Sequence, residues 1–87
     1  MIRTVLLSTQ AHGDYDALDP MVRHRVKEGL LRLAKTGRGD VKKLKGVGKG
    51  ADLYRLRIGG IRIVFGLTPT ELQVTRIFPR SKGYEWL

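Results

Sequence analysis

The chain has 87 residues, of which 41% are apolar, and a formal net charge of +9, with 17 Lys and Arg against 8 Asp and Glu. This size predicts one domain with one modest core, spanning residues 1–87, and the apolar content excludes a disordered tail. The lack of cysteine excludes a disulfide framework and a thiolate nucleophile, and it fits the reducing cytoplasm in which we expect the protein. No segment is long and apolar enough to span a membrane.

The positive charge is unevenly distributed along the chain. Residues 1–36 contain six basic and four acidic side chains, whereas residues 37–87 contain eleven basic and four acidic ones. Solubility alone would account for a basic surface. An excess of this size, concentrated in one half of a small protein, favours instead a polyanionic partner, either nucleic acid or an acidic protein.

The beginning of the sequence predicts a strand and then a short helix. Residues 3–7 (RTVLL) are rich in β-branched and aliphatic side chains, which favours a strand. Residues 9–18 are ambiguous because Gly13 weakens a helix. No strand pattern competes there, so we expect a short helix. Asp14 and Asp16 are interpreted as solvated surface carboxylates.

A longer helix is expected over residues 20–36. Asp19 can accept hydrogen bonds from the first-turn N–H groups, and Pro20 stands where a missing N–H has no cost. Gly37 is placed to end the helix. Four apolar residues at helical spacing predict its buried stripe: Val22, Val26, Leu30 and Leu33.

Residues 37–51 are interpreted as a basic loop with at most a turn of structure around residues 41–44. Five glycines alternate there with four lysines, Lys42, Lys43, Lys45 and Lys49. The glycines do not form a P-loop, because the Gly-Lys-Ser/Thr ending and the helix that should follow it are both missing.

The clearest local pattern is a β-hairpin. Residues 52–58 and 61–67 are β-patterned, and only Gly59-Gly60 separates them, which predicts a two-residue type I′ turn. A last strand is expected over residues 71–78. The order β-α-α-β-β-β with short links at the end predicts an α+β fold, in which two helices pack on one face of an antiparallel sheet.

A two-residue turn also fixes which residues of the hairpin face each other. One face is then apolar and must meet the helices, with Ile58 opposite Ile61, Leu56 opposite Ile63 and Tyr54 opposite Phe65. On the other face Arg57 lies opposite Arg62, and Arg55 lies two residues along. The Cα atoms of such a non-hydrogen-bonded pair approach to roughly 4.5 Å, so the two like charges destabilise the hairpin.

Two interpretations of these arginines remain open. The guanidinium groups either spread into water or pair with Asp40, Asp52 or Glu85, or they form a preformed site for an anion, since their forks match phosphate oxygens. Arg80 and Tyr84 follow the last strand and should lie near this face. Tyr84 is a candidate for stacking on a base, for donating to a phosphate, or for capping the core.

The chain shows no pattern for metal or histidine chemistry. His12 and His24 have no ligand at metal spacing, and no Ser-His-Asp arrangement stands out, so we predict no metal and no cofactor. RNA cleavage tolerates this lack, because the 2′-hydroxyl of RNA attacks its own phosphate and arginines can neutralise the growing charge. Tyr84 could accept the proton only if nearby cations lower the pKa of its hydroxyl.

Three segments together resemble the RelE/ParE superfamily of bacterial type II toxin–antitoxin toxins: residues 40–46 (DVKKLKG), 53–65 (LYRLRIGGIRIVF) and 76–84 (RIFPRSKGY). The resemblance covers nearly the whole chain and favours the RelE branch. It implies an antiparallel sheet with two helices on one side. It also implies an mRNA interferase, an endoribonuclease that cleaves mRNA on the ribosome and thereby inhibits translation.

The resemblance also implies residue roles and partners. The family's active-site positions fall on Arg55, Arg57, Arg62, Arg80 and Tyr84. Further contacts to RNA or the ribosome are expected from Lys42, Lys43, Lys45, Lys49, Arg76 and Lys82. The implied partners are mRNA, the ribosome and a cognate antitoxin, which would bind as an acidic or amphipathic helical segment in a hetero-oligomer.

One departure from the family pattern leaves other functions open. The best-known RelE pattern has lysines where this chain has Arg55 and Arg57, and arginine stays protonated, so it is a poor general base. A ParE-like inhibitor of DNA gyrase without nuclease activity is one alternative. A toxin that has lost its activity and acts as an antitoxin-bound regulator is another.

Overall fold

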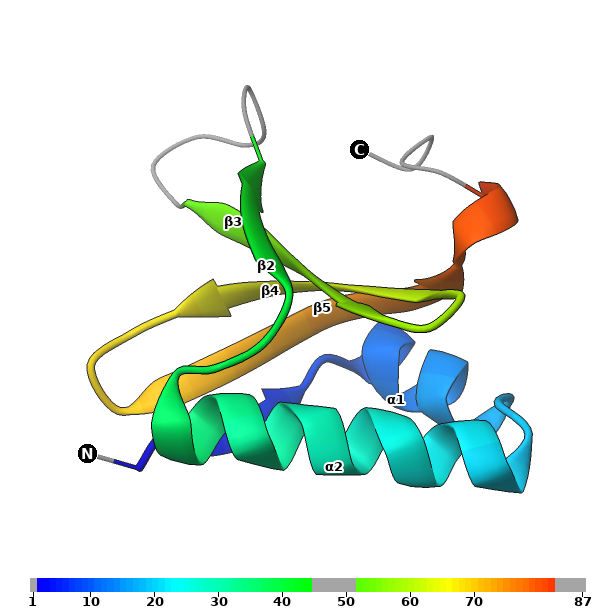
Figure 1. Cartoon of the computed structure of the whole chain (residues 1–87), viewed down its shortest axis with the longest axis horizontal. Helices are drawn as coiled ribbons and strands as arrows, with labels where there is room; N and C mark the ends of the chain where they lie inside the picture. The colour runs from blue at the N-terminus through cyan, green and yellow to red at the C-terminus, as the bar shows by residue number, and fades with distance from the viewer. Residues whose placement is uncertain (1, 45–51, 83–87) are drawn as a thin grey trace.

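The computed structural model describes residues 2–44 and 52–82. Within these ranges the elements are β1 (Thr4–Leu7), α1 (Thr9–Asp16), α2 (Pro20–Thr36), β2 (Val41–Leu44), β3 (Leu53–Ile58), β4 (Ile61–Leu67), β5 (Glu71–Pro79) and a 3-10 helix (Arg80–Lys82). Both helices lie on the same side of one sheet, as Figure 1 shows. The predicted α+β class is therefore confirmed. No helix in the described ranges is long and apolar enough to cross a membrane.

The sheet has five strands in the order β1-β5-β4-β3-β2, and it is mixed, not antiparallel as predicted. β1 pairs in parallel with β5, from Thr4 opposite Glu71 to Leu7 opposite Val74, and the other pairs are antiparallel. Short turns force antiparallel neighbours in the β3–β4–β5 part. β1 and β5 are separated by most of the chain, so no turn sets their direction.

β2 replaces the loop that the sequence predicted for residues 41–44. It is an edge strand that pairs only with β3 among the described strands, from Val41 opposite Leu56 to Leu44 opposite Leu53. Three of its four residues are exposed. An exposed edge strand needs no apolar alternation, because backbone hydrogen bonds to β3 hold it, and this is why sequence reasoning missed it.

The two helices begin at capping side chains. The Asp19 carboxylate accepts a hydrogen bond from the N–H of Met21 (3.2 Å), and Gly37 ends α2 at φ 73°. Ser8 caps α1 by accepting from the N–H of Ala11 (3.0 Å), which fixes the short helix that the sequence left ambiguous. The predicted stripe of α2 packs on the core, with Val26, Leu30 and Leu33 buried and Val22 partly buried.

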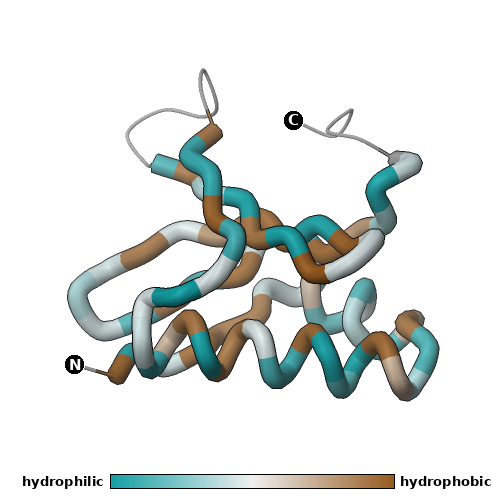
Figure 2. The backbone as a smooth tube through the Cα atoms, in the orientation of Figure 1, coloured by the Kyte–Doolittle hydropathy of each residue, from teal (hydrophilic) through white to brown (hydrophobic). Residues whose placement is uncertain are grey.

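The hairpin register is the predicted one. Leu56 faces Ile63 and Tyr54 faces Phe65, and these residues belong to the core beneath the helices. The rings of Tyr54 and Phe65 stack with centroids 5.6 Å apart. Figure 2 shows hydrophilic and hydrophobic residues alternating along this part of the sheet. The same register places Arg57 opposite Arg62 on the face that points away from the helices.

The turn of the hairpin differs from the prediction. Of its two glycines only Gly59 has a positive φ, of 56°. A positive φ at the first central position alone matches a type II′ turn, whereas the predicted type I′ turn needs it at both. Gly59 is thus the residue whose conformation an L side chain would strain.

Replacing Gly59 by alanine should destabilise the protein by about 1–2 kcal/mol, since a Cβ is disfavoured at this φ. Gly60→Ala is the matched control, because neither glycine has an atom within 4 Å of an added Cβ and only Gly59 has the strained φ. The control should be neutral or slightly stabilising. Urea unfolding of both variants measures the difference, and equal stabilities would contradict the assigned turn.

Candidate functional site

Three arginines from β3 and β4, Arg55, Arg57 and Arg62, lie on the sheet face opposite the helices, which we call the arginine face. Arg57 and Arg62 are direct cross-strand neighbours, and Arg55 stands two residues before Arg57 on the same strand face. Buried apolar side chains lie beside these arginines on the neighbouring strands. Val64 pairs with Arg55, and Phe78 pairs with Arg62. Apolar surroundings strengthen the interaction of a guanidinium group with an anion.

Arg55 is more enclosed than Arg57. Its side chain is only 13% exposed. Its Nη1 atom is buried and makes no hydrogen bond within the described residues. A buried donor without an acceptor is costly, so an oxygen that reached this atom would bind favourably.

Asp40 is the carboxylate that the structure places among these arginines. Its Oδ2 accepts a hydrogen bond from Nε of Arg57 at 2.7 Å, and its Oδ1 lies 3.6 Å from Nη1 of Arg55, in ion-pair range but beyond a hydrogen bond. Asp52 pairs with Lys43 instead (3.4 Å), and Glu85 lies outside the described residues. Among the residues that the structure describes, this single carboxylate cannot neutralise three guanidinium groups, so their combined charge stays positive.

Arg62 and Arg80 lie toward the turn end of the hairpin. Nη1 of Arg62 reaches the carbonyl oxygens of Gly59 and Ile61 at 3.4 and 3.5 Å, which are long contacts. The backbone N–H of Arg80 donates to the carbonyl oxygen of Gly60 at 2.8 Å, so the exposed Arg80 starts beside the turn. Tyr84, the fifth predicted active-site residue, lies outside the described residues.

The predicted lysines divide between the two faces of the sheet. Lys42 is opposite Arg55 and so shares the arginine face, whereas Lys43 is opposite Tyr54 on the other face. Both are exposed on the edge strand β2. Lys45 and Lys49 lie outside the described residues, and Lys82 belongs to the 3-10 helix that follows β5.

Arg76 is engaged by α1. Its Nε donates to Oδ2 of Asp14 at 2.8 Å, and the N–H of Ile77 donates to the same oxygen at 2.9 Å. The register of β5 shifts here, so that Val64 faces Arg76 while Phe65 faces Val74. The interpretation of Asp14 as solvated surface was therefore wrong. The register shift beside these partners has no signature in the sequence.

Several solved structures with this fold are toxin–antitoxin complexes. A chain of the archaeal RelE–RelB complex from Pyrococcus horikoshii aligns at 25% identity and a TM-score of 0.76, covering 95% of this chain and 100% of that one. A chain of the Mycobacterium tuberculosis RelBE2 complex aligns at 23% identity and a TM-score of 0.76, over 92% and 100%. The Escherichia coli RelBE complex aligns at 20% and 0.74, over 88% and 95%.

The chain has the fold of these RelE proteins and is therefore RelE-like. The resemblance seen in the sequence is thereby confirmed. Neither protein-family models nor curated protein sequences gave a match. The relationship is thus visible in the backbone and in short motifs around the hairpin.

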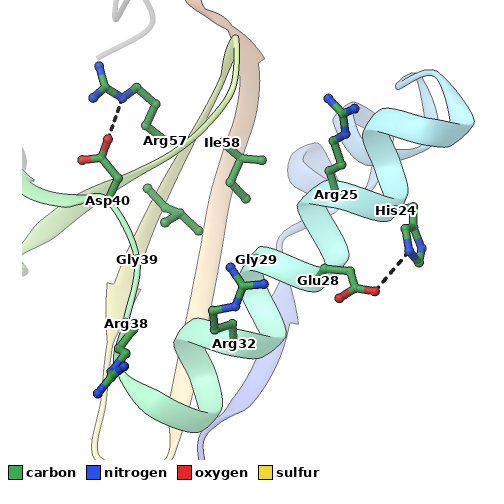
Figure 3. Close-up of a pocket in the computed structure, with 11 residues that line it drawn as sticks. His24, Arg25, Glu28, Gly29, Arg32, Arg38, Gly39, Asp40, Arg57 and Ile58 are labelled. Atoms are coloured by element: carbon green, nitrogen blue, oxygen red, sulfur yellow. Dashed lines mark hydrogen bonds and ion pairs between the residues drawn. The ribbon is translucent and has the colours of Figure 1, made fainter.

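Two features of this RelE-like chain were not predicted as parts of a site. One is the position of Asp40 within the arginine cluster. The other is a cleft of about 470 Å³ between α2 and the loop before β2, with Arg25, Arg32, Arg38, Asp40 and Arg57 in its lining. Figure 3 shows the ion pair between Asp40 and Arg57 at the sheet side of this cleft. The described residues contain no group of three or more His, Cys, Asp or Glu that could hold a metal.

Proposed function

We propose that this RelE-like chain is the toxin of a type II toxin–antitoxin system, and that it cleaves ribosome-associated mRNA in the cytoplasm without a metal ion. The observation that carries the proposal is the set of three arginines on one sheet face, beside the buried side chains of Val64 and Phe78. Several solved structures of the same fold are RelE–RelB or RelBE complexes, which supports the same class of function.

The proposed reaction takes its nucleophile from the RNA. The 2′-oxygen attacks the neighbouring phosphorus, the bond from phosphorus to the 5′-oxygen breaks, and the products are a 2′,3′-cyclic phosphate and a 5′-hydroxyl. One proton leaves the 2′-hydroxyl and one is added to the departing oxygen. Arg55, Arg57 and Arg62 would hold the phosphate and offset the charge on its oxygens. Arg80 would assist from beside the turn, and Tyr84 is the candidate for proton transfer.

The proposed protein partner is a cognate antitoxin in a hetero-oligomer. An acidic or amphipathic helical segment would complement the net charge of +9. The structural neighbours in RelE–RelB complexes support such a partner. A short acidic reading frame beside the gene is the expected genetic arrangement.

Induction of the chain in bacteria tests this function against its alternatives. We expect incorporation of labelled amino acids to stop while plasmid supercoiling stays normal. Relaxed plasmids with continuing translation would point to a gyrase inhibitor and overturn the proposal. Normal growth with both processes intact would indicate a protein that has lost its toxicity.

Binding of single-stranded RNA should weaken steeply with salt. If three or four cations contact phosphates, the logarithm of the affinity should fall against the logarithm of the salt concentration with a slope of about −2 to −3. Fluorescence anisotropy with a labelled oligonucleotide measures the slope. A flat response would mean that the arginine face does not hold the RNA backbone.

A further inference from the structure

The backbone of Asp40 is fixed against β3. The N–H of Arg57 donates to the carbonyl oxygen of Asp40 at 3.0 Å, which continues the ladder between β2 and β3 by one residue. Gly39 lets the chain pass close to the core, because an added Cβ would stand 2.9 Å from Cδ1 of the buried Leu56. The backbone pairing with β3 therefore places the Asp40 carboxylate on the arginine face.

The carboxylate contacts the arginines selectively. Oδ2 accepts a hydrogen bond from Nε of Arg57, while Oδ1 lies 3.6 Å from Nη1 of Arg55. Arginine has five N–H donors, and the bond at Nε occupies one of them. The Arg57 side chain is 51% exposed, so its Nη groups can meet a ligand while the Nε bond is kept.

We propose that Asp40 is a positioning residue of this cluster, which holds Arg57 through Nε and keeps Arg55 beside it, so that both present donors to one phosphate. The proposal rests on the RNA-cleaving function proposed above. A guanidinium group directly opposite Arg62 would otherwise turn away from that like charge. The orientation of the two guanidinium groups should affect the cleavage rate, since cleavage requires the phosphate to be held in line with the 2′-oxygen.

Asp40→Ala should separate binding from catalysis. The loss of one negative charge should leave affinity for an RNA oligonucleotide unchanged or tighter, whereas the cleavage rate at saturating RNA should fall by about 10- to 100-fold. Asp40→Asn keeps an oxygen that accepts from Nε and should retain most of the rate. Asp52→Asn removes the same charge from the exposed pair with Lys43 and should cleave at the full rate.

Three outcomes would overturn the proposal. Faster cleavage by Asp40→Ala would mean that the carboxylate competes with phosphate. Equal losses of rate in Asp40→Asn and Asp40→Ala would assign the effect to charge alone. A parallel loss of affinity and folded structure in both variants would make the role of Asp40 merely structural.

A second measurement does not depend on cleavage. The Nε–H signal of Arg57 in nitrogen–proton NMR spectra should be protected from exchange in the native protein and in Asp40→Asn, and unprotected in Asp40→Ala. The protection should persist when a 2′-O-methyl oligonucleotide, which cannot be cleaved, is bound. If the native protein cleaves no RNA, the proposed enzymatic function is wrong, but this experiment still tests whether Asp40 positions Arg57. Loss of Nε–H protection on oligonucleotide binding would show that phosphate displaces the carboxylate, and it would contradict the proposed role of Asp40.

Discussion

Replacing Arg62 by alanine should lower RNA cleavage by about 10²- to 10³-fold and relieve growth arrest while the fold survives. A preorganised donor to a developing negative charge has an effect of this size. Arg62 stands directly opposite Arg57 on the arginine face. The only hydrogen bonds of its side chain within the described residues are long contacts to carbonyl oxygens near the turn, so removal of the side chain should cost little stability.

Lys35→Ala is the matched control for Arg62→Ala. Lys35 is an exposed cation in the last turn of α2, on the helical side of the molecule. Its loss changes the net charge by the same amount, and the variant should remain toxic. Cleavage rates, growth curves and circular dichroism of both variants make the comparison. If Arg62→Ala stays as active as the control, the arginine face is not the catalytic site.

Replacing Asp14 by alanine should have the largest effect on stability, a loss of about 2–3 kcal/mol. Asp14 accepts from the Arg76 side chain and from the N–H of Ile77. The Asp14 and Arg76 side chains are only 20% and 25% exposed. Alanine would leave the Ile77 N–H without this acceptor and would remove one ion-pair partner of the largely enclosed Arg76. For a domain of this size, the melting temperature should fall by roughly 10–20 °C.

Two variants separate the contributions at Asp14. Asp14→Asn keeps an oxygen for the N–H of Ile77 and should lose less stability than alanine. Asp16→Ala removes a carboxylate from the same helix, where its partner is the exposed His12, and should change little. Urea unfolding of the three variants tests the order. Similar stability of Asp14→Ala and Asp16→Ala would mean that the contact with β5 contributes nothing.

The sequence predicted best those elements that local chemistry specifies. The Asp19-Pro20 start and the Gly37 end delimit α2, and both act within one helical turn. The two glycines of the hairpin set its register, which in turn paired Arg57 with Arg62. The sign of φ at Gly60 was not predictable in the same way, because Gly-Gly is compatible with both primed turns.

The features that were missed depend on contacts between distant segments. The parallel pairing of β1 with β5 and the edge strand β2 are decided by the assembled sheet. Asp14 acquires its role from Arg76, which lies 62 residues further along the chain, where the register of β5 shifts. Asp40 was only one of three acidic residues considered as partners for the arginines, and its place in the β2–β3 ladder decided between them.

The most direct test of RNA cleavage is to map transcript ends in cells after induction of the protein. The proposed reaction predicts new 5′-hydroxyl ends within the coding regions of translated messages. These ends should appear within minutes for the native chain and be absent for Arg62→Ala. Intact transcripts together with normal translation, in cells that contain the folded native protein, would contradict the assignment of this arginine face as a ribonuclease site.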